Sequence, residues 1–142
     1  MASDRSIGPS LYELLAGHVG GVPLDERDEA TQEILSVMEN LKQILNTRAG
    51  ALKHLPDYGL PDLSQIYRAL PASAHLLKTQ MEKTLLAYEP RIRSIDLELL
   101  HDTDPGMLVS YDLTCHLKKA GLVRYGTHFD PSGRTLMQWR GR

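Results

Sequence analysis

Glu89 and Arg91 are the residues whose types and spacing most favour chemistry, and they flank Pro90 in the run Tyr88-Glu-Pro-Arg-Ile92. A carboxylate that acts as a general acid, as in glycoside hydrolysis, must be kept protonated while a second carboxylate works across a cleft. If the two side chains meet, the guanidinium of Arg91 favours the ionised form of Glu89 and opposes that role. We therefore expect a charge-assisted pair that fixes local geometry or contacts a partner, and no catalytic residue.

The patterns of other chemical sites do not occur in the sequence. The six histidines form no pair at the spacing of helical or zinc-finger ligands, and there is one cysteine, so we expect no metal and no cofactor. The segment Asp102-Thr-Asp-Pro-Gly106 is similar to the start of a calcium loop, but its glycine comes one place early and the twelfth position is Leu113. We interpret it as a turn. Cys115 lies on the apolar side of a predicted strand, which indicates a packed thiol.

The composition predicts one domain. The chain has 142 residues, of which 42% are hydrophobic, and this is enough to bury one core. A formal net charge of -2 disfavours a general nucleic-acid or anionic-membrane binder. No apolar run has the length that spans a bilayer, and Met1-Ala-Ser-Asp-Arg5 does not lead into a signal-peptide core. We expect a cytoplasmic protein with no nucleic-acid partner and no direct membrane insertion.

Residues 1–24 are expected to form a partly extended N-terminal arm, since six glycines and prolines interrupt them. Ser10 and Glu13 have the spacing of a capping box, which predicts a short amphipathic helix whose apolar edge is Leu11, Leu14 and Leu15. A helix this short is unstable alone in water, so we expect it to dock on its own domain or on another subunit.

Helices are expected in the chain before the Glu89 and Arg91 pair. Apolar residues at helical spacing predict a long helix from about Glu26 to Leu45, with Ile34, Val37, Met38, Leu41, Ile44 and Leu45 on its buried face. Asn46 and Gly50 suit the end of that helix, and a turn-rich loop follows. Asp62 is placed to cap a short helix that runs to Leu70, and Ser73 is placed to cap a further helix that runs to Tyr88. Pro90 ends that helix, because proline disfavours the helical conformation of the residue before it.

Strands are expected after Pro90. Residues Ile95, Leu97 and Leu99 alternate with polar residues, which predicts a half-buried strand over about residues 91–100. Similar alternation marks a second strand around residues 109–117, and turn residues separate a third and a short fourth strand. Short links favour antiparallel neighbours. The fold class is therefore α+β, with N-terminal helices packed on a C-terminal antiparallel β-meander of about four strands over residues 25–142.

Three segments together resemble a known family: Leu45-Asn-Thr-Arg-Ala-Gly50, Pro56-Asp-Tyr-Gly-Leu-Pro-Asp-Leu63 and Tyr88-Glu-Pro-Arg-Ile92. In this order and at these separations they are similar to the baseplate wedge proteins of tailed phages that are called lysozyme-like. Within that family they are similar to the TssE group of bacterial type VI secretion systems. The Glu-Pro-Arg signature falls on Glu89, Pro90 and Arg91, and Ile92 stands where the family usually has leucine.

The resemblance implies a non-enzymatic subunit of a cytoplasmic, membrane-docked baseplate, which sits beside TssF, TssG and TssK and helps connect the contractile sheath to the baseplate. It implies that the Glu-Pro-Arg signature is an assembly feature. We expect partner contacts at Glu89, Pro90, Arg91, Arg48, Tyr58, Leu11, Leu14 and Leu15. We expect the motif residues Asn46, Thr47, Gly50, Gly59, Pro61 and Asp62 to have structural roles.

The sequence leaves several alternatives open. Glu89 and Arg91 can contact a wedge or sheath subunit, or they can tie the helix end to their own domain. An exposed edge of the sheet can also accept a strand from the sheath by main-chain pairing. The alternative functions are peptidoglycan hydrolysis and a regulatory adaptor that binds and occludes another protein on the same fold.

Overall fold

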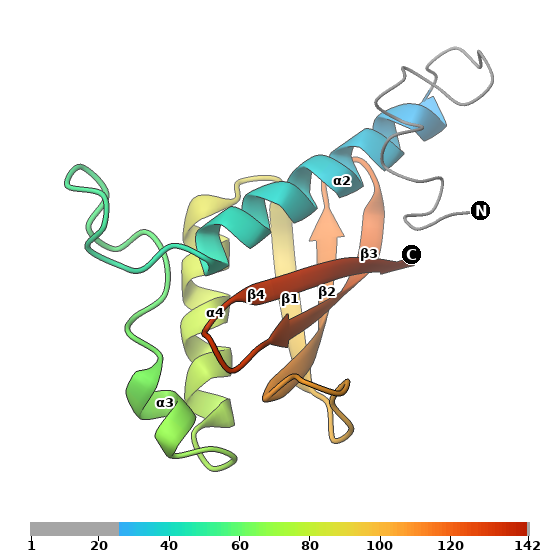
Figure 1. The fold of residues 1–142 in the computed structure, drawn as a ribbon. Coiled ribbons are helices and arrows are strands. Elements are labelled where there is room, and N and C mark those ends of the chain that lie inside the picture. Colours follow the sequence, from blue (N-terminus) through green and yellow to red (C-terminus); the bar gives the residue numbers. More distant parts are fainter. Residues whose placement is uncertain (1–25, 142) are drawn as a thin grey trace.

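The chain folds into three described helices followed by a four-stranded sheet, as the computed structural model shows (Figure 1). The structure describes residues 26–141, with side chains from residue 29 onward. The arm expected at residues 1–24, with its leucines Leu11, Leu14 and Leu15, lies outside the described residues. Within residues 26–141, no helix combines the length and apolar character that crossing a membrane requires.

Helix α2 spans Glu26–Leu45, as its apolar spacing predicts. Its predicted face is in the core: Ile34, Val37, Leu41, Ile44 and Leu45 are fully buried, and Met38 packs against them. The helix ends at Leu45, just before Asn46, and Gly50 adopts a φ of 95° in the following turn. A left-handed conformation of this kind favours glycine, which explains the turn at this point.

Helices α3 (Ser64–Arg68) and α4 (Ala74–Tyr88) follow the loop. Asp62 accepts hydrogen bonds from the main-chain N–H of Ser64 at 3.1 Å and from its hydroxyl at 3.0 Å, so it stabilises the start of α3. The helix ends at Arg68, two residues before the expected Leu70. Ser73 precedes α4, but the expected side-chain cap is wrong, because the Ser73 hydroxyl donates to the carbonyl of Ile66.

The sheet is an antiparallel meander in the order β1-β2-β3-β4, which confirms the α+β class. Its strands are β1 (Ile92–Leu99), β2 (Val109–Leu117), β3 (Gly121–Phe129) and β4 (Thr135–Gly141). Strand β1 is one residue shorter at each end than predicted, and its register with β2 shifts between Ile92 and Ser94.

Helices α2 and α4 cover the same face of the sheet. Tyr125 on β3 donates its hydroxyl hydrogen bond to the carbonyl of Ile34 in α2, and Tyr111 on β2 donates to the carbonyl of Ala74 in α4. Both tyrosines are fully buried. A buried hydroxyl needs such a partner, so these two bonds fix where each helix lies on the sheet. The core lies between this face and the two helices.

Candidate functional site

The junction between α4 and β1 holds the predicted pair. The N–H of Glu89 donates to the carbonyl of Leu85 at 3.0 Å and completes the last turn of α4. Glu89 itself is extended, with φ of -126° and ψ of 92°, as expected of a residue that precedes proline. Pro90 and Arg91 then turn the chain into β1. The sequence therefore places Glu89 and Arg91 on either side of a sharp change of direction.

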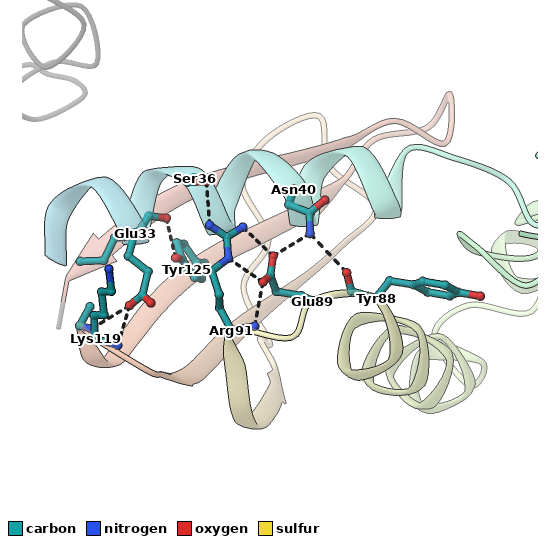
Figure 2. Close-up of polar contacts among 10 residues, drawn as sticks. Glu33, Ser36, Asn40, Tyr88, Glu89, Arg91, Lys119 and Tyr125 are labelled. Carbon is teal, nitrogen blue, oxygen red and sulfur yellow. Dashed lines mark hydrogen bonds and ion pairs between the residues drawn. The ribbon is translucent and has the colours of Figure 1, made fainter. Parts of the chain in front are cut away.

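The Glu89 carboxylate points into the protein, where it is 1% exposed (Figure 2). Its Oε1 accepts hydrogen bonds from the main-chain N–H of Arg91 at 2.9 Å and from Arg91 Nε at 2.8 Å. Its Oε2 accepts from Arg91 Nη2 at 2.8 Å and from Asn40 Nδ2 on α2 at 2.6 Å. Four donors thus surround one buried carboxylate, and the guanidinium binds it in the two-point geometry that arginine favours.

These contacts keep Glu89 ionised. Burial alone would raise the pKa of its carboxyl, but the hydrogen bonds from Arg91 and Asn40, together with the charge of Arg91, outweigh burial and lower the pKa. The same pairing raises the pKa of Arg91, against the smaller opposing effect of its own burial. An ionised, enclosed carboxylate can orient Arg91, and it is unsuited to donate a proton.

Arg91 also faces the surface. Its side chain is 35% exposed, and its Nη1 donates to the Ser36 hydroxyl on α2 at 2.8 Å. A cleft of about 500 Å³ opens beside it, lined by Glu29, Gln32, Glu33, Ser36, Arg91, Lys118 and Lys119. The guanidinium is therefore held from inside by Glu89 and remains accessible from outside.

Glu33 holds the opposite wall of this cleft. Its Oε1 accepts hydrogen bonds from the main-chain N–H groups of Lys119 at 3.0 Å and Ala120 at 2.8 Å, in the turn between β2 and β3 (Figure 2). The Glu33 side chain is almost fully buried. Since two turn amides share one oxygen, Glu33 fixes that turn against α2.

The loop after α2 carries the other two motifs. The Asn46 side chain pairs with the main chain of Thr135 at the start of β4. Its Oδ1 accepts from the N–H of Thr135 at 2.8 Å, and its Nδ2 donates to the Thr135 carbonyl at 3.0 Å. Arg48 Nη2 donates to the carbonyl of Gly133 at 2.7 Å, and its Nη1 donates to that of Leu45 at 3.0 Å. Both residues therefore fasten the loop to the turn between β3 and β4.

Gly59 allows two segments of the loop, residues 47–49 and 59–60, to lie close together. Its φ is 106°, and a Cβ atom added there would lie 2.2 Å from the carbonyl oxygen of Thr47. The N–H of Leu60 donates to the carbonyl of Thr47 at 2.9 Å, and the carbonyl of Leu60 accepts from the N–H of Ala49 at 2.8 Å. Only glycine combines this conformation with such a close approach. Pro61, next in the chain, is half-buried.

Tyr58 connects the loop to the Glu89 junction. Its ring packs edge-on against the ring of Tyr88, with centroids 5.0 Å apart and an angle of 69° between planes. The structure thus brings the segments around residues 58 and 88 together, although thirty positions separate them in the chain. The partner contacts expected at Glu89, Pro90, Arg91, Arg48 and Tyr58 stay predictions.

Five residues of the site carry no functional signal in the sequence: Glu33, Ser36, Asn40, Lys118 and Lys119. Glu33 and Asn40 occur at polar positions of a helix whose period indicates only a buried face. The signal available was that both lie beside the apolar stripe of α2, where a long polar side chain can reach the sheet. The sequence around Lys118 and Lys119 has the pattern of an ordinary turn.

The remaining candidates behave as packed or turn residues. Cys115 is fully buried, and burial, with a smaller effect of the Glu89 charge, raises the pKa of its thiol to about 12. Residues 102–106 lie in the turn between β1 and β2, as the interpretation of this segment as a turn predicts. Across residues 26–141, no three His, Cys, Asp or Glu side chains gather as metal ligands would.

Comparison with known proteins adds two matches. A family model described as baseplate wedge protein gp25 matches residues 31–119. A chain in the solved structure titled "The baseplate complex from the type VI secretion system" is 38% identical, with a TM-score of 0.57 over 80% of this chain and 96% of that chain. No curated protein sequence matches significantly. The family match includes α4, the Glu89 junction and the turn that carries Lys118 and Lys119.

Proposed function

Since this chain belongs to the baseplate wedge protein gp25 family, we propose that it is the TssE-type structural subunit of a type VI secretion baseplate. The observation that carries the proposal is the 38% identity to a chain of a type VI baseplate complex over 80% of this sequence. Identity of 38% over four-fifths of this chain and nearly all of that chain supports the same structural role. The specific neighbours that we propose are TssF, TssG and TssK, with the contractile sheath above them.

The subunit acts through contacts and not through catalysis. The best candidate for an acid, Glu89, is 1% exposed and surrounded by four donors that favour its charged form. A glycosidase acid needs the opposite environment and access to its substrate. A cell-wall turbidity assay, with Glu89→Gln as the control, tests the alternative of peptidoglycan hydrolysis. Lysis that depends on Glu89 would overturn the structural assignment.

Arg91 is the residue of the Glu-Pro-Arg signature that we propose as the contact. Glu89 and Pro90 position it: the carboxylate holds one side of the guanidinium, and the proline sets the direction of the chain. The baseplate lies at the cytoplasmic side of the membrane in this proposal. The helix α2, the loop over residues 46–63 and the sheet form the frame around the contact.

Assembly with defined partners tests the proposal. The full chain is co-expressed with TssF, TssG and TssK from a type VI gene cluster, and the complex is purified through a tag on TssK. We expect this chain to elute with the wedge at constant stoichiometry and to restore secretion in a host that lacks its own subunit. Folded protein that never joins the wedge, and never restores secretion, would contradict the proposal.

A substitution at Arg91 tests the contact. Arg91→Lys keeps the positive charge beside buried Glu89 but removes the two-point geometry, so the domain should stay folded while the yield of complex falls. Arg91→Glu is a poor choice, because it places a second carboxylate beside a buried one and should destabilise the fold itself. Arg93→Lys, at an exposed position on β1, is the matched control.

A further inference from the structure

We propose that the cleft between α2 and the β2–β3 turn receives an acidic segment of a neighbouring baseplate protein. This inference rests on the proposed function and names the chemistry of the partner at the Arg91 contact. The cleft lies between α2 and two segments that meet there, because the N–H of Lys118 donates to the carbonyl of Arg91 at 3.1 Å. The start of β1 and the β2–β3 turn therefore form one continuous wall opposite the helix.

Two of the three carboxylates at this cleft, those of Glu33 and Glu89, face inward and are occupied. Glu89 binds Arg91 and Asn40, and Glu33 binds the two amides of the turn. Glu89 is 1% exposed and Glu33 is 7% exposed. A partner that approaches from solvent therefore meets little of their negative charge directly. Glu29, at the outer end of α2, is the exposed carboxylate of the lining.

The cations of the cleft face outward and keep free donors. Arg91 uses three of its N–H groups on Glu89 and Ser36, and a guanidinium has five. Lys118 and Lys119 are both exposed, and neither ammonium has an ion-pair partner among the described residues. Three positive groups thus line one cleft with unused donors, against one exposed carboxylate.

A carboxylate-bearing peptide segment fits these donors best. Two or three Asp or Glu side chains can accept from Arg91 and both lysines at once, and Arg91 is already oriented by Glu89, so little of its side-chain freedom remains to be lost. A long polyanion such as nucleic acid fits less well, because the chain as a whole carries a net charge of -2. Contacts between opposite charges of this kind weaken as salt is added.

Zero-length crosslinking locates the partner group. A carbodiimide joins a lysine amine to a carboxylate only when the two are in contact, so the purified complex of the full chain with TssF and TssG is treated and analysed by mass spectrometry. We expect Lys118 or Lys119 joined to an Asp or Glu of the partner. Crosslinks confined to this chain's own N-terminal residues would show that the cleft is filled from within, and would overturn the proposal.

Charge reversal measures how much the cleft contributes. Lys118→Glu with Lys119→Glu should weaken binding to the TssF–TssG pair about tenfold and flatten its dependence on NaCl concentration. Lys53→Glu with Lys83→Glu makes the same change in net charge at two exposed positions away from the cleft, and should leave affinity within about twofold. Equal losses in the two double variants would mean that only overall charge matters, and would refute an acidic partner in this cleft.

The two proposals fail differently. If the wild-type chain does not bind the TssF–TssG pair or enter the wedge, the proposed function fails, and the acidic contact fails with it. If the wild-type chain assembles while the cleft double variant binds with unchanged affinity, the baseplate role stands and the acidic partner is wrong. Thermal unfolding of each variant alone shows whether a loss of binding reflects a loss of fold.

Discussion

The Glu89 carboxylate accepts a hydrogen bond of 2.6 Å from the side-chain amide of Asn40, which joins the C-terminal half of α2 to the turn between α4 and β1. This bond makes the Glu-Pro-Arg segment part of the domain's internal structure as well as its surface. Asn40 Nδ2 also lies 3.4 Å from the carbonyl of Tyr88, the last residue of α4. One amide therefore holds the end of a helix and the carboxylate that orients Arg91.

Asn40→Ala should lower the free energy of unfolding by about 1–3 kcal/mol, because it removes a hydrogen bond to a buried charged group. Chemical denaturation of the purified chain measures the change. Ser36→Ala is the matched control on the same helix, since Ser36 contacts the exposed side of Arg91 and its loss should cost less than about 1 kcal/mol. Equal costs for the two variants would contradict the role given to Asn40.

Acid should destabilise the wild-type protein partly through Glu89. Its pKa is lower in the folded chain than the ordinary value near 4.5, so the unfolded chain binds more protons in that range and stability falls as the pH drops below 4.5. The stability that ionised Glu89 contributes is fully present above pH 4.5 and is lost as the pH falls through the lowered pKa of the folded protein. Glu89→Gln should be less stable at pH 7 and should lose less on acidification to pH 3. The free energy of unfolding of both proteins is measured at several pH values. An equal loss between pH 7 and pH 3 in the two proteins would refute the prediction.

Gly59→Ala should destabilise the loop far more than Gly50→Ala. Both glycines have a positive φ, of 106° and 95°, so both substitutions introduce backbone strain of about 1 kcal/mol. A Cβ at residue 59 would in addition lie 2.2 Å from a carbonyl oxygen, whereas a Cβ at residue 50 would meet nothing within 4 Å. Thermal unfolding of the two variants separates the clash from the strain. Similar melting temperatures would show that the loop can move apart.

Asn46→Ala should expose the first residue of β4 to solvent. The Asn46 side chain pairs with both main-chain groups of Thr135, so its loss should raise the hydrogen-exchange rate of the Thr135 amide and cost about 1 kcal/mol of stability. The amide of Val123, in the middle of the sheet, should exchange as before and serves as the control. Unchanged exchange at Thr135 would mean that another group protects it.

Cys115 should resist thiol reagents in the folded protein. It is fully buried and its pKa is raised to about 12, so almost no reactive thiolate is present at neutral pH. Labelling by a maleimide should follow global unfolding in urea, with the same midpoint as the loss of helical signal. Rapid labelling of the native chain would contradict a packed thiol.

The predicted elements that depend on local pattern agree closely with the structure. Helix α2 has its predicted bounds, α4 ends at Tyr88 before Pro90, and the four strands form the predicted meander. Capping was predicted less well. Ser73 stands directly before α4, yet its hydroxyl donates to the carbonyl of Ile66, seven residues earlier in the chain. A tertiary partner replaced the local one that the sequence suggested.

The Glu89 and Arg91 pair shows which features the sequence determines and which the tertiary structure determines. The sequence by itself determined that the two residues flank Pro90 at a change from helix to strand, and that their charges favour a pair, because these properties depend on neighbours along the chain. Only the tertiary structure decided that Glu89 faces inward and Arg91 remains partly exposed. That choice depends on Asn40 and Ser36 of α2, and on Lys118 of the β2–β3 turn, which folding brings beside a junction far away in sequence. No period or spacing encodes such contacts, since each residue involved looks like an ordinary surface position until the helix is packed on the sheet.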